Sequence, residues 1–321
     1  MADDSSESVY PFQPNKGAAI FFTVAFAATG LSHLWQNWYY KFWRLTSHLL
    51  FCGLLMVAGF VARSYGAFHN DNQEAYTATL LLIYASPPFL GVTNYLILTR
   101  LFLFVPYCAP MHPNRTLAFV STLTVLMVVL SLVGIGYLTD RNSPDKSVNI
   151  GDTLTKVSIV LQIVVGGLFF LVAGLFHSSC LERKINNTRV MRPLYAAYAS
   201  MFFFLGRNIY RMVVHFGIPV SRNEMNSSSL DIVVRYEWYF MVFEATFIFL
   251  SLAVWNVAHP GRFLPPDPRK YLAQNNRTIL DGPGWKDSRT ITELLFDPFN
   301  MVHASDGNER KFWEHNGYHR R

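Results

Sequence analysis

LGRNIYRMVVHFG (residues 205–217) and YEWYFMVFEATFIFL (residues 236–250) are two apolar segments that follow one another along the chain. The first carries Arg207 and Arg211, and the second carries Glu237 and Glu244. A charge near the middle of a bilayer costs roughly 2.5–3.5 kcal/mol on insertion scales, so such residues face a partner or a water-filled cavity. The two segments therefore predict a pair of membrane-spanning helices whose charged side chains meet inside the protein.

The composition of the whole chain is that of a membrane protein. Hydrophobic residues make up 51% of the 321 residues and charged residues only 15%, and the mean hydropathy is +0.20. A soluble domain usually carries about 25% charged residues. The formal net charge of +6 comes mostly from short loops between apolar segments. Nucleic-acid binding is therefore not expected.

Seven apolar segments are long enough to span a bilayer, which takes roughly 20 helical residues. We expect spans near residues 17–38, 45–66, 76–99, 116–138, 153–177, 192–216 and 236–258. Most of the 27 lysines and arginines then fall in the loops of one side and in the C-terminal segment, which marks that side as cytoplasmic. The predicted fold is an all-α integral membrane protein, a seven-helix bundle with its N-terminus outside. Residues 1–16 are then extracellular, and residues 259–321 form a cytoplasmic tail that we expect to be largely disordered.

Four N-x-S/T sequons test this orientation, at Asn114, Asn186, Asn226 and Asn276. Glycan attachment requires lumenal exposure, so in this topology only Asn226 can be modified. Modification of Asn186 would contradict it.

The charged residues of the last two spans fall at matching depths. At 1.5 Å per residue, Arg207 and Glu244 lie roughly 13 and 12 Å below the outer ends of their helices. Arg207 and Arg211 share one helix face, as do Glu237 and Glu244. We therefore expect Arg207 opposite Glu244 and Arg211 nearer Glu237.

Two other spans place polar side chains in the same layer, Gln162 in the fifth and Tyr84 in the third. Tyr84 is followed by Ser86-Pro87-Pro88, and two adjacent prolines in mid-span predict a break in the helix. The layer has two interpretations, a structural ion pair that locks two helices or the lining of a ligand site. His33, His48 and His259 would lie towards the inner side and His215 at the outer end, but no HxxxH or HExxH spacing occurs within the spans, so we expect no metal site and no other cofactor.

Three motifs at the end of the spans carry a family resemblance: GRNIYR (206–211), YEWYFMVFEA (236–245) and NVAHPGR (256–262). With them, the chain resembles the fungal RTA-like seven-helix membrane proteins, also called lipid-translocating exporters, over roughly residues 10–265. His215 stands where that family usually has a glutamate, and Glu244 where it usually has an aspartate. The other matching residues are Tyr10, Pro11, His33, Pro88, Tyr95, Arg100, Gly151 and Gln162.

The resemblance implies a multi-pass protein, expected in the plasma membrane or alternatively in an endomembrane, that moves a lipid-like amphiphile. Sphingoid-base, sterol-like and porphyrin-like molecules are the implied substrates, in lipid homeostasis and in stress or drug resistance. The chain has no GxxxxGK[ST] motif, so transport driven directly by ATP is not expected.

The alternatives to transport are a seven-helix sensor of such a lipid and an intramembrane lipid hydrolase, and we expect no enzyme activity. The expected partners are the amphiphile and membrane lipids. The candidate ligand-binding residues are Arg207, Arg211, Glu237, Glu244, Gln162, Tyr84 and Tyr210.

Overall fold

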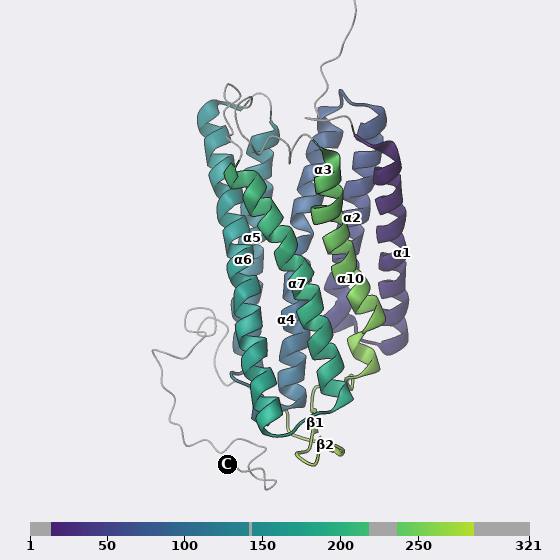
Figure 1. Cartoon of the computed structure of the whole chain (residues 1–321), viewed down its shortest axis with the longest axis vertical. Helices are drawn as coiled ribbons and strands as arrows, with labels where there is room; N and C mark the ends of the chain where they lie inside the picture. The colour runs from purple at the N-terminus through teal and green to yellow at the C-terminus, as the bar shows by residue number, and fades with distance from the viewer. Residues whose placement is uncertain (1–13, 141–142, 218–235, 286–321) are drawn as a thin grey trace, which may run out of the picture.

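The apolar segments form long helices that run side by side along the molecule in a computed structural model (Figure 1), which describes residues 14–140, 143–217 and 236–285. The first helices are α1 (Lys16–Tyr40), α2 (Trp43–Phe68), α3 (Gln73–Ala85), α4 (Pro87–Phe104), α5 (Pro113–Thr139) and α6 (Asp145–Glu182). They are followed by α7 (Thr188–Gly217), α9 (Glu237–Phe240), the π-helical turn η2 (Met241–Thr246) and α10 (Phe247–Val257).

Within the described ranges these elements make seven crossings of the bundle, because α3 leads into α4 and because α9, η2 and α10 follow one another. Six of the crossings contain a section apolar enough to span a membrane by length and composition. The remaining one is α7, which has 30 residues and includes Arg207 and Arg211. The predicted class, an all-α membrane protein, is confirmed, and the orientation of the termini stays a prediction.

Local sequence signals set several helix ends. The side chain of Asn15 accepts a hydrogen bond from the backbone N–H of Ala18 at 3.0 Å, and Asn72 caps α3 in the same way. An asparagine at this position satisfies one of the free N–H groups of the first helical turn. At the other end of α1, Lys41 adopts a left-handed conformation with φ of 55°, which ends the helix and lets α2 start at Trp43.

The α3–α4 segment lies at the centre of the bundle. In its apolar window, 72% of the residues are buried inside the protein, compared with 33–44% in the other five windows. The α4 helix packs against α2, α5, α6, α7 and α10, whereas α1 packs against α2 and α10. The other helices therefore surround α4 and turn their outer faces to the membrane.

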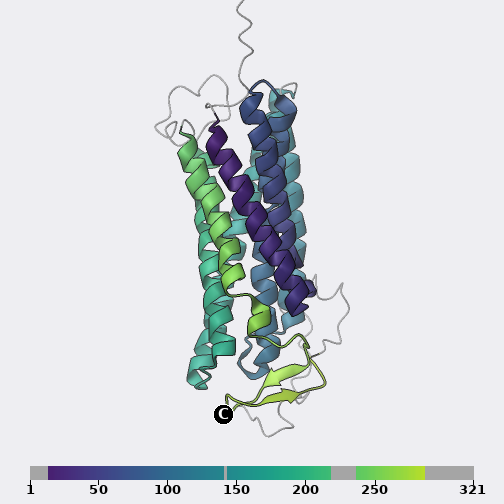
Figure 2. The same ribbon diagram turned by 90° about the vertical axis from the view of Figure 1, so that its right-hand side faces the viewer.

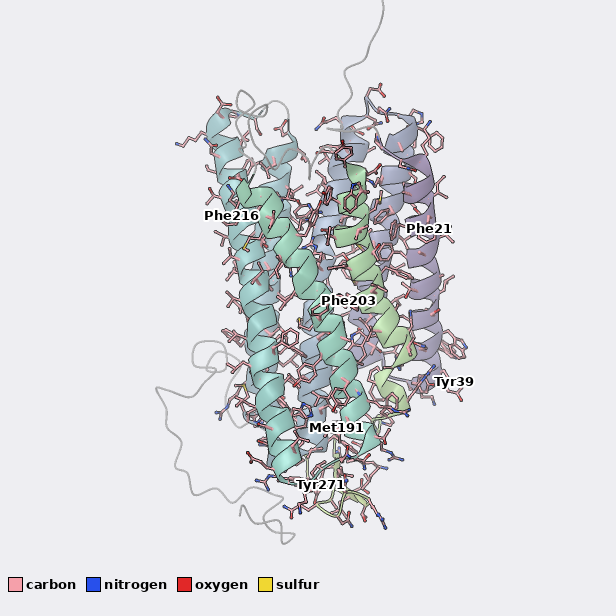
Figure 3. The ribbon with its side chains drawn as sticks, viewed as in Figure 1. Phe21, Tyr39, Met191, Phe203, Phe216 and Tyr271 are labelled. Atoms are coloured by element: carbon pink, nitrogen blue, oxygen red, sulfur yellow. The ribbon has the colours of Figure 1, made fainter. Side chains whose placement is uncertain are left out.

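Exposed aromatic side chains gather near both ends of the bundle. Trp35, Trp38 and Tyr39 lie at the end of α1, and Trp238 and Phe216 lie near the opposite end. Figure 3 labels Tyr39 and Phe216 toward the two ends. Tryptophan and tyrosine concentrate where a membrane meets water, so these residues mark the two interfaces of the bilayer.

The segment after the last helix is ordered over residues 259–285 and lies at one end of the bundle (Figure 2). It contains the short 3₁₀ helix η3 (Pro260–Arg262) and an antiparallel hairpin of β1 (Lys270–Leu272) and β2 (Ile279–Asp281), in which Tyr271 pairs with Leu280. Nη2 of Arg100 on α4 donates to the carbonyl oxygens of Pro265 and Asp267, both at 2.5 Å.

The prediction that residues 259–321 are largely disordered is therefore wrong for 259–285. Two features hold this part in place: the buried side chains of Tyr271 and Leu272, and the carbonyl oxygens that accept from buried Arg100. Residues 286–321, to which the same prediction applies, lie outside the described residues.

Candidate functional site

Arg207 and Arg211 of α7 share the single carboxylate of Glu244. Nε and Nη2 of Arg207 donate to Oε1 of Glu244 at 2.8 and 2.6 Å, and Nε of Arg211 donates to Oε2 at 2.6 Å. The two arginines are four residues apart and so lie on the same helix face. Glu244 is 0% exposed, and both of its oxygens are taken up by arginines of α7. The predicted pairing of Arg207 with Glu244 is present.

The remaining nitrogen of Arg207 bonds within the protein as well. Its Nη1 donates to the side-chain oxygen of Asn208 at 2.8 Å and to that of Gln162 at 3.4 Å. Gln162 in turn donates to the hydroxyl oxygen of Ser158 on α6. All the donor nitrogens of Arg207 therefore have acceptors, and its guanidinium joins α6, α7 and η2.

Arg211 faces a different set of partners. Its guanidinium carbon lies 3.8 Å from the centre of the Tyr84 ring, and its Nη1 donates to the Tyr84 hydroxyl. That hydroxyl also lies 2.6 Å from Nε2 of His215. Tyr84, the penultimate residue of α3, therefore links the arginine to a histidine one turn further along α7.

Arg207, Arg211, Glu244, Gln162 and Tyr84 thus form one charged cluster from four crossings of the bundle. The cluster carries two guanidinium groups and one carboxylate, so its formal charge is positive. Within the part of the chain that the structure describes, Nη2 of Arg211 has no hydrogen-bond partner. A donor nitrogen in this position can donate a hydrogen bond to a molecule bound beside it.

Two irregular turns border the charged cluster. Glu244 lies in the π-helical turn η2, and α3 is separated from α4 at Ser86, two residues after Tyr84. π-helical turns occur frequently at functional sites. The break at Ser86 agrees with the prediction from the two prolines, and the Ser86 hydroxyl lies 3.0 Å from the sulfur of Cys52 on α2.

A pocket of about 230 Å³, which we call the cluster pocket, lies directly beside Arg211, Tyr84 and His215. Its walls are formed by Tyr76 and Leu80 of α3, Ile135 and Leu138 of α5, and Tyr210 and Val214 of α7. The lining is therefore mainly apolar and includes the charged group of Arg211. Such a combination suits a small molecule with an apolar body and a polar group.

Tyr210 and Glu237 are placed differently from the charged cluster. Tyr210 lines the cluster pocket and stacks on Phe243, with ring centres 5.6 Å apart. Glu237 accepts instead from Nη2 of Arg63 at 2.5 Å and from the backbone N–H of Asn15 at 2.5 Å. The predicted approach of Arg211 to Glu237 is therefore wrong.

The π-helical turn explains this difference. In a regular helix Glu237 and Glu244, seven residues apart, share a face. The wider turn η2 lies between them and changes the phase, so that Glu244 points to α7 while Glu237 meets Arg63 of α2. The phenyl ring of Phe240 is near the guanidinium groups of both Arg63 and Arg211. Its centre is 4.4 Å from the guanidinium carbon of Arg63 and 5.7 Å from that of Arg211.

Sequence reasoning missed Arg63 and His215 as members of this region. Arg63 had a signal, because it is an arginine inside an apolar span. His215 stood out only as a departure from the family pattern, and nothing in its spacing pointed to Tyr84. In the described ranges, no three histidine, cysteine or acidic side chains lie close enough together to hold a metal ion.

Comparison with known proteins gives one family. The family model for "RTA1 like protein" matches residues 49–267. A "Lipid-translocating exporter-like protein RTA1" of Leptosphaeria maculans is 35% identical over 310 residues, which are 92% of this chain and 58% of that protein. The chain thus spans less than two thirds of the length of that relative.

Two further relatives are more distant. A protein of the same description from Ajellomyces capsulatus is 28% identical over 84% of this chain and 86% of its own length. A "Probable lipid transporter atnI" of Emericella nidulans is 26% identical over 80% of this chain and 68% of its own length. No solved structure matches the chain.

Proposed function

Because this chain belongs to the RTA1-like family, we propose that it carries a lipid-like amphiphile across the membrane and binds the polar head of that molecule in the cluster pocket. The names of the relatives, lipid-translocating exporter and lipid transporter, support the class of cargo. The observation that carries the proposal is the position of Arg211, which lines the pocket and has one donor nitrogen without a partner among the described residues.

The two arginines have different roles in this proposal. Arg207 is 1% exposed, and each of its three side-chain nitrogens donates to a protein acceptor. It therefore joins α6, α7 and η2 and keeps Glu244 in place. Arg211 shares Glu244 but also faces the pocket, so it is the group that meets a ligand. Tyr84 and His215 lie beside it and supply a hydroxyl and an imidazole ring at hydrogen-bond distance from each other.

The charge of the cluster determines which polar headgroup of an amphiphile fits the cluster pocket. Glu244 is fully enclosed by arginines and offers no free carboxylate to a cationic amine. Nη2 of Arg211, which has no partner in the described ranges, is a donor and binds an acceptor or an anion. A phosphate, a carboxylate or a hydroxyl head therefore fits this pocket better than the amine of a sphingoid base. Because the chain has no P-loop motif, we also propose that movement does not use ATP directly.

A pair of neighbouring substitutions on α7 tests the pocket. Val214→Trp places a large ring inside the cluster pocket, whereas Val213→Trp places the same ring on the outer surface, where Val213 is 40% exposed. The assay is movement of fluorescent phosphatidic acid across the membrane of proteoliposomes, followed by chemical quenching of the outer leaflet. We expect Val214→Trp to abolish protein-dependent movement and Val213→Trp to retain it.

Equal movement with both variants would contradict the assignment of the pocket. Arg211→Gln tests the chemistry of the head, because it removes the charge beside the pocket. It should slow phosphatidic acid by about tenfold or more, while fluorescent sphingosine, which has an amine head, is affected less. Binding of the lipid without any movement by the wild type would point to a sensor instead.

A further inference from the structure

A second and larger pocket, of about 650 Å³, lies at the hairpin end of the bundle. We call it the hairpin-end pocket. It is bounded by the turn between α1 and α2, the last turns of α4, the start of α5, and Pro266 and Pro268 of the segment that precedes the hairpin. The charged cluster described above plays no part in it, and Figure 1 shows the hairpin at the end opposite the start of α1.

One side of this pocket is basic. Lys41, Arg44 and Arg100 line it, and the first two side chains are exposed while Arg100 is 3% exposed. Among the described residues, none of the three forms an ion pair with a carboxylate. The carbonyl oxygens of Pro265 and Asp267 occupy Nη2 of Arg100, whereas its Nη1 has no partner in the same ranges.

Asp267, an acid close to this group, holds its carboxylate within its own loop. The carboxylate of Asp267 accepts from the backbone N–H of Arg269 at 2.9 Å; it is near enough to attract Arg100 by its charge but forms no ion pair with it, and the backbone carbonyl of Asp267 accepts from Arg100. Three basic side chains thus line one pocket, and within the described ranges none of them is ion-paired with a carboxylate. A buried guanidinium nitrogen beside a pocket can bind an anion, and the planar guanidinium group matches the geometry of carboxylate and phosphate groups.

The other side of the pocket is apolar and lies at the membrane surface. It is lined by Phe42, Trp43, Leu45, Leu96, Leu103 and Leu117. Trp43 is 40% exposed and follows Trp38 and Tyr39, which are more exposed still. Exposed tryptophan and tyrosine residues mark the depth of the lipid headgroups, so the pocket opens where headgroup and acyl chains meet.

We propose that the hairpin-end pocket binds an anionic membrane lipid through its phosphate, with Lys41, Arg44 and Arg100 around the phosphate and the acyl chains along the leucines. Basic pockets between membrane helices on the cytoplasmic side hold the headgroups of such lipids. The distribution of lysine and arginine predicts that this end of the protein faces the cytoplasm, which is the leaflet that carries anionic lipids. The proposal does not rest on the transport proposed above, since binding here needs no movement of cargo.

Two double variants separate the pocket from the general charge of this end. Lys41→Gln/Arg44→Gln removes two exposed basic groups from the pocket. Lys184→Gln/Arg189→Gln removes two exposed basic groups at the same end but outside the pocket. The pairs are well matched, because Lys41 and Lys184 share a left-handed backbone conformation, with φ of 55° and 57°.

Native mass spectrometry of the full chain in neutral detergent measures the binding of phosphatidylinositol 4-phosphate. Phosphatidylcholine with the same acyl chains, whose headgroup has no net charge, and water-soluble inositol 1,4-bisphosphate serve as the neutral-lipid and headgroup-only probes. We expect the wild type to bind the anionic lipid at least about tenfold more tightly than either probe. The pocket double variant should lose about tenfold in this affinity, and the control double variant should stay within about twofold of the wild type.

Three results would overturn the proposal. Unchanged binding by the pocket double variant would exclude Lys41 and Arg44, and an equal loss in the control would show that only the total charge matters. If inositol 1,4-bisphosphate bound as tightly as the lipid, the ligand would be a soluble phosphate. Because all four substituted residues are exposed, both variants are expected to fold, and thermal unfolding in detergent checks this.

Discussion

Nε of Arg211 donates to Oε2 of Glu244 at 2.6 Å, inside a bundle where these two side chains are 5% and 0% exposed. This contact gives Glu244 a second cationic partner, because its other oxygen already accepts from Arg207. The three residues therefore form a triad with one acid. Removing that acid takes away the carboxylate partner of both arginines, so we expect it to lower stability most.

We predict that Glu244→Ala lowers stability more than Arg207→Ala does. The loss of Glu244 leaves two buried guanidinium groups without a carboxylate, and a buried pair broken on one side typically costs about 3–5 kcal/mol. After Arg207→Ala, Glu244 still has Arg211. Thermal unfolding in detergent measures the difference, and exposed Glu182→Ala is the control for loss of a carboxylate. If both triad variants unfolded at the same temperature, the sharing of Glu244 would be refuted.

We predict that Arg63 and Glu237 are coupled in stability. Their side chains are 3% and 10% exposed and 2.5 Å apart, so they join α2 to the start of α9. A double-mutant cycle of Arg63→Ala and Glu237→Ala should give an interaction energy of about 0.5–3 kcal/mol. Arg63→Ala combined with Glu182→Ala, at the opposite end, should be additive. An additive result for the first pair would mean that this ion pair contributes nothing to stability.

We predict that the hairpin segment stabilises the bundle. A chain that stops after Leu264 lacks the carbonyl oxygens that accept from Arg100, and a hydrogen bond to a charged group contributes about 1.5–3 kcal/mol. A chain that stops after Trp285 keeps these contacts and the hairpin. In detergent, the shorter chain should unfold at a clearly lower temperature than the full chain, and the longer one should match the full chain. Equal unfolding of both truncations would show that the hairpin is dispensable.

We predict that the three sequons at the hairpin end of the bundle are not glycosylated. Asn114, Asn186 and Asn276 lie at the hairpin end, whereas Asn226 lies outside the described residues. With the N-terminus outside, no glycan is attached to the first three sequons. The measurement is the shift in gel mobility on glycosidase treatment of the protein from eukaryotic cells, with each asparagine changed to glutamine in turn. A glycan at Asn186 would show that the hairpin end is lumenal and would contradict the predicted orientation.

The parts of the fold that follow from hydropathy and depth could be predicted from sequence. Apolar length indicated the crossings, and the matching depths of Arg207 and Glu244 indicated that they meet. The partner of Arg211 could not be predicted in this way, because counting residues along a helix assumes a constant turn, and η2 breaks that assumption. The order of residues 259–285 depends on contacts with α4 that are distant in sequence, and composition alone contains no sign of them.

The interruption at Ser86 determines how the cluster pocket can change its shape. Pro87 and Pro88 have no N–H to donate to the turn before them, so fewer backbone hydrogen bonds join α3 to α4 here than in an uninterrupted helix. Tyr84 is two residues from Ser86, whereas Tyr76 is ten residues away, about 15 Å at 1.5 Å per residue. A small tilt of α3 would therefore swing Tyr76 much further than Tyr84. Such a tilt would change the width of the cluster pocket beside Tyr76 and would hardly move the polar groups beside Arg211.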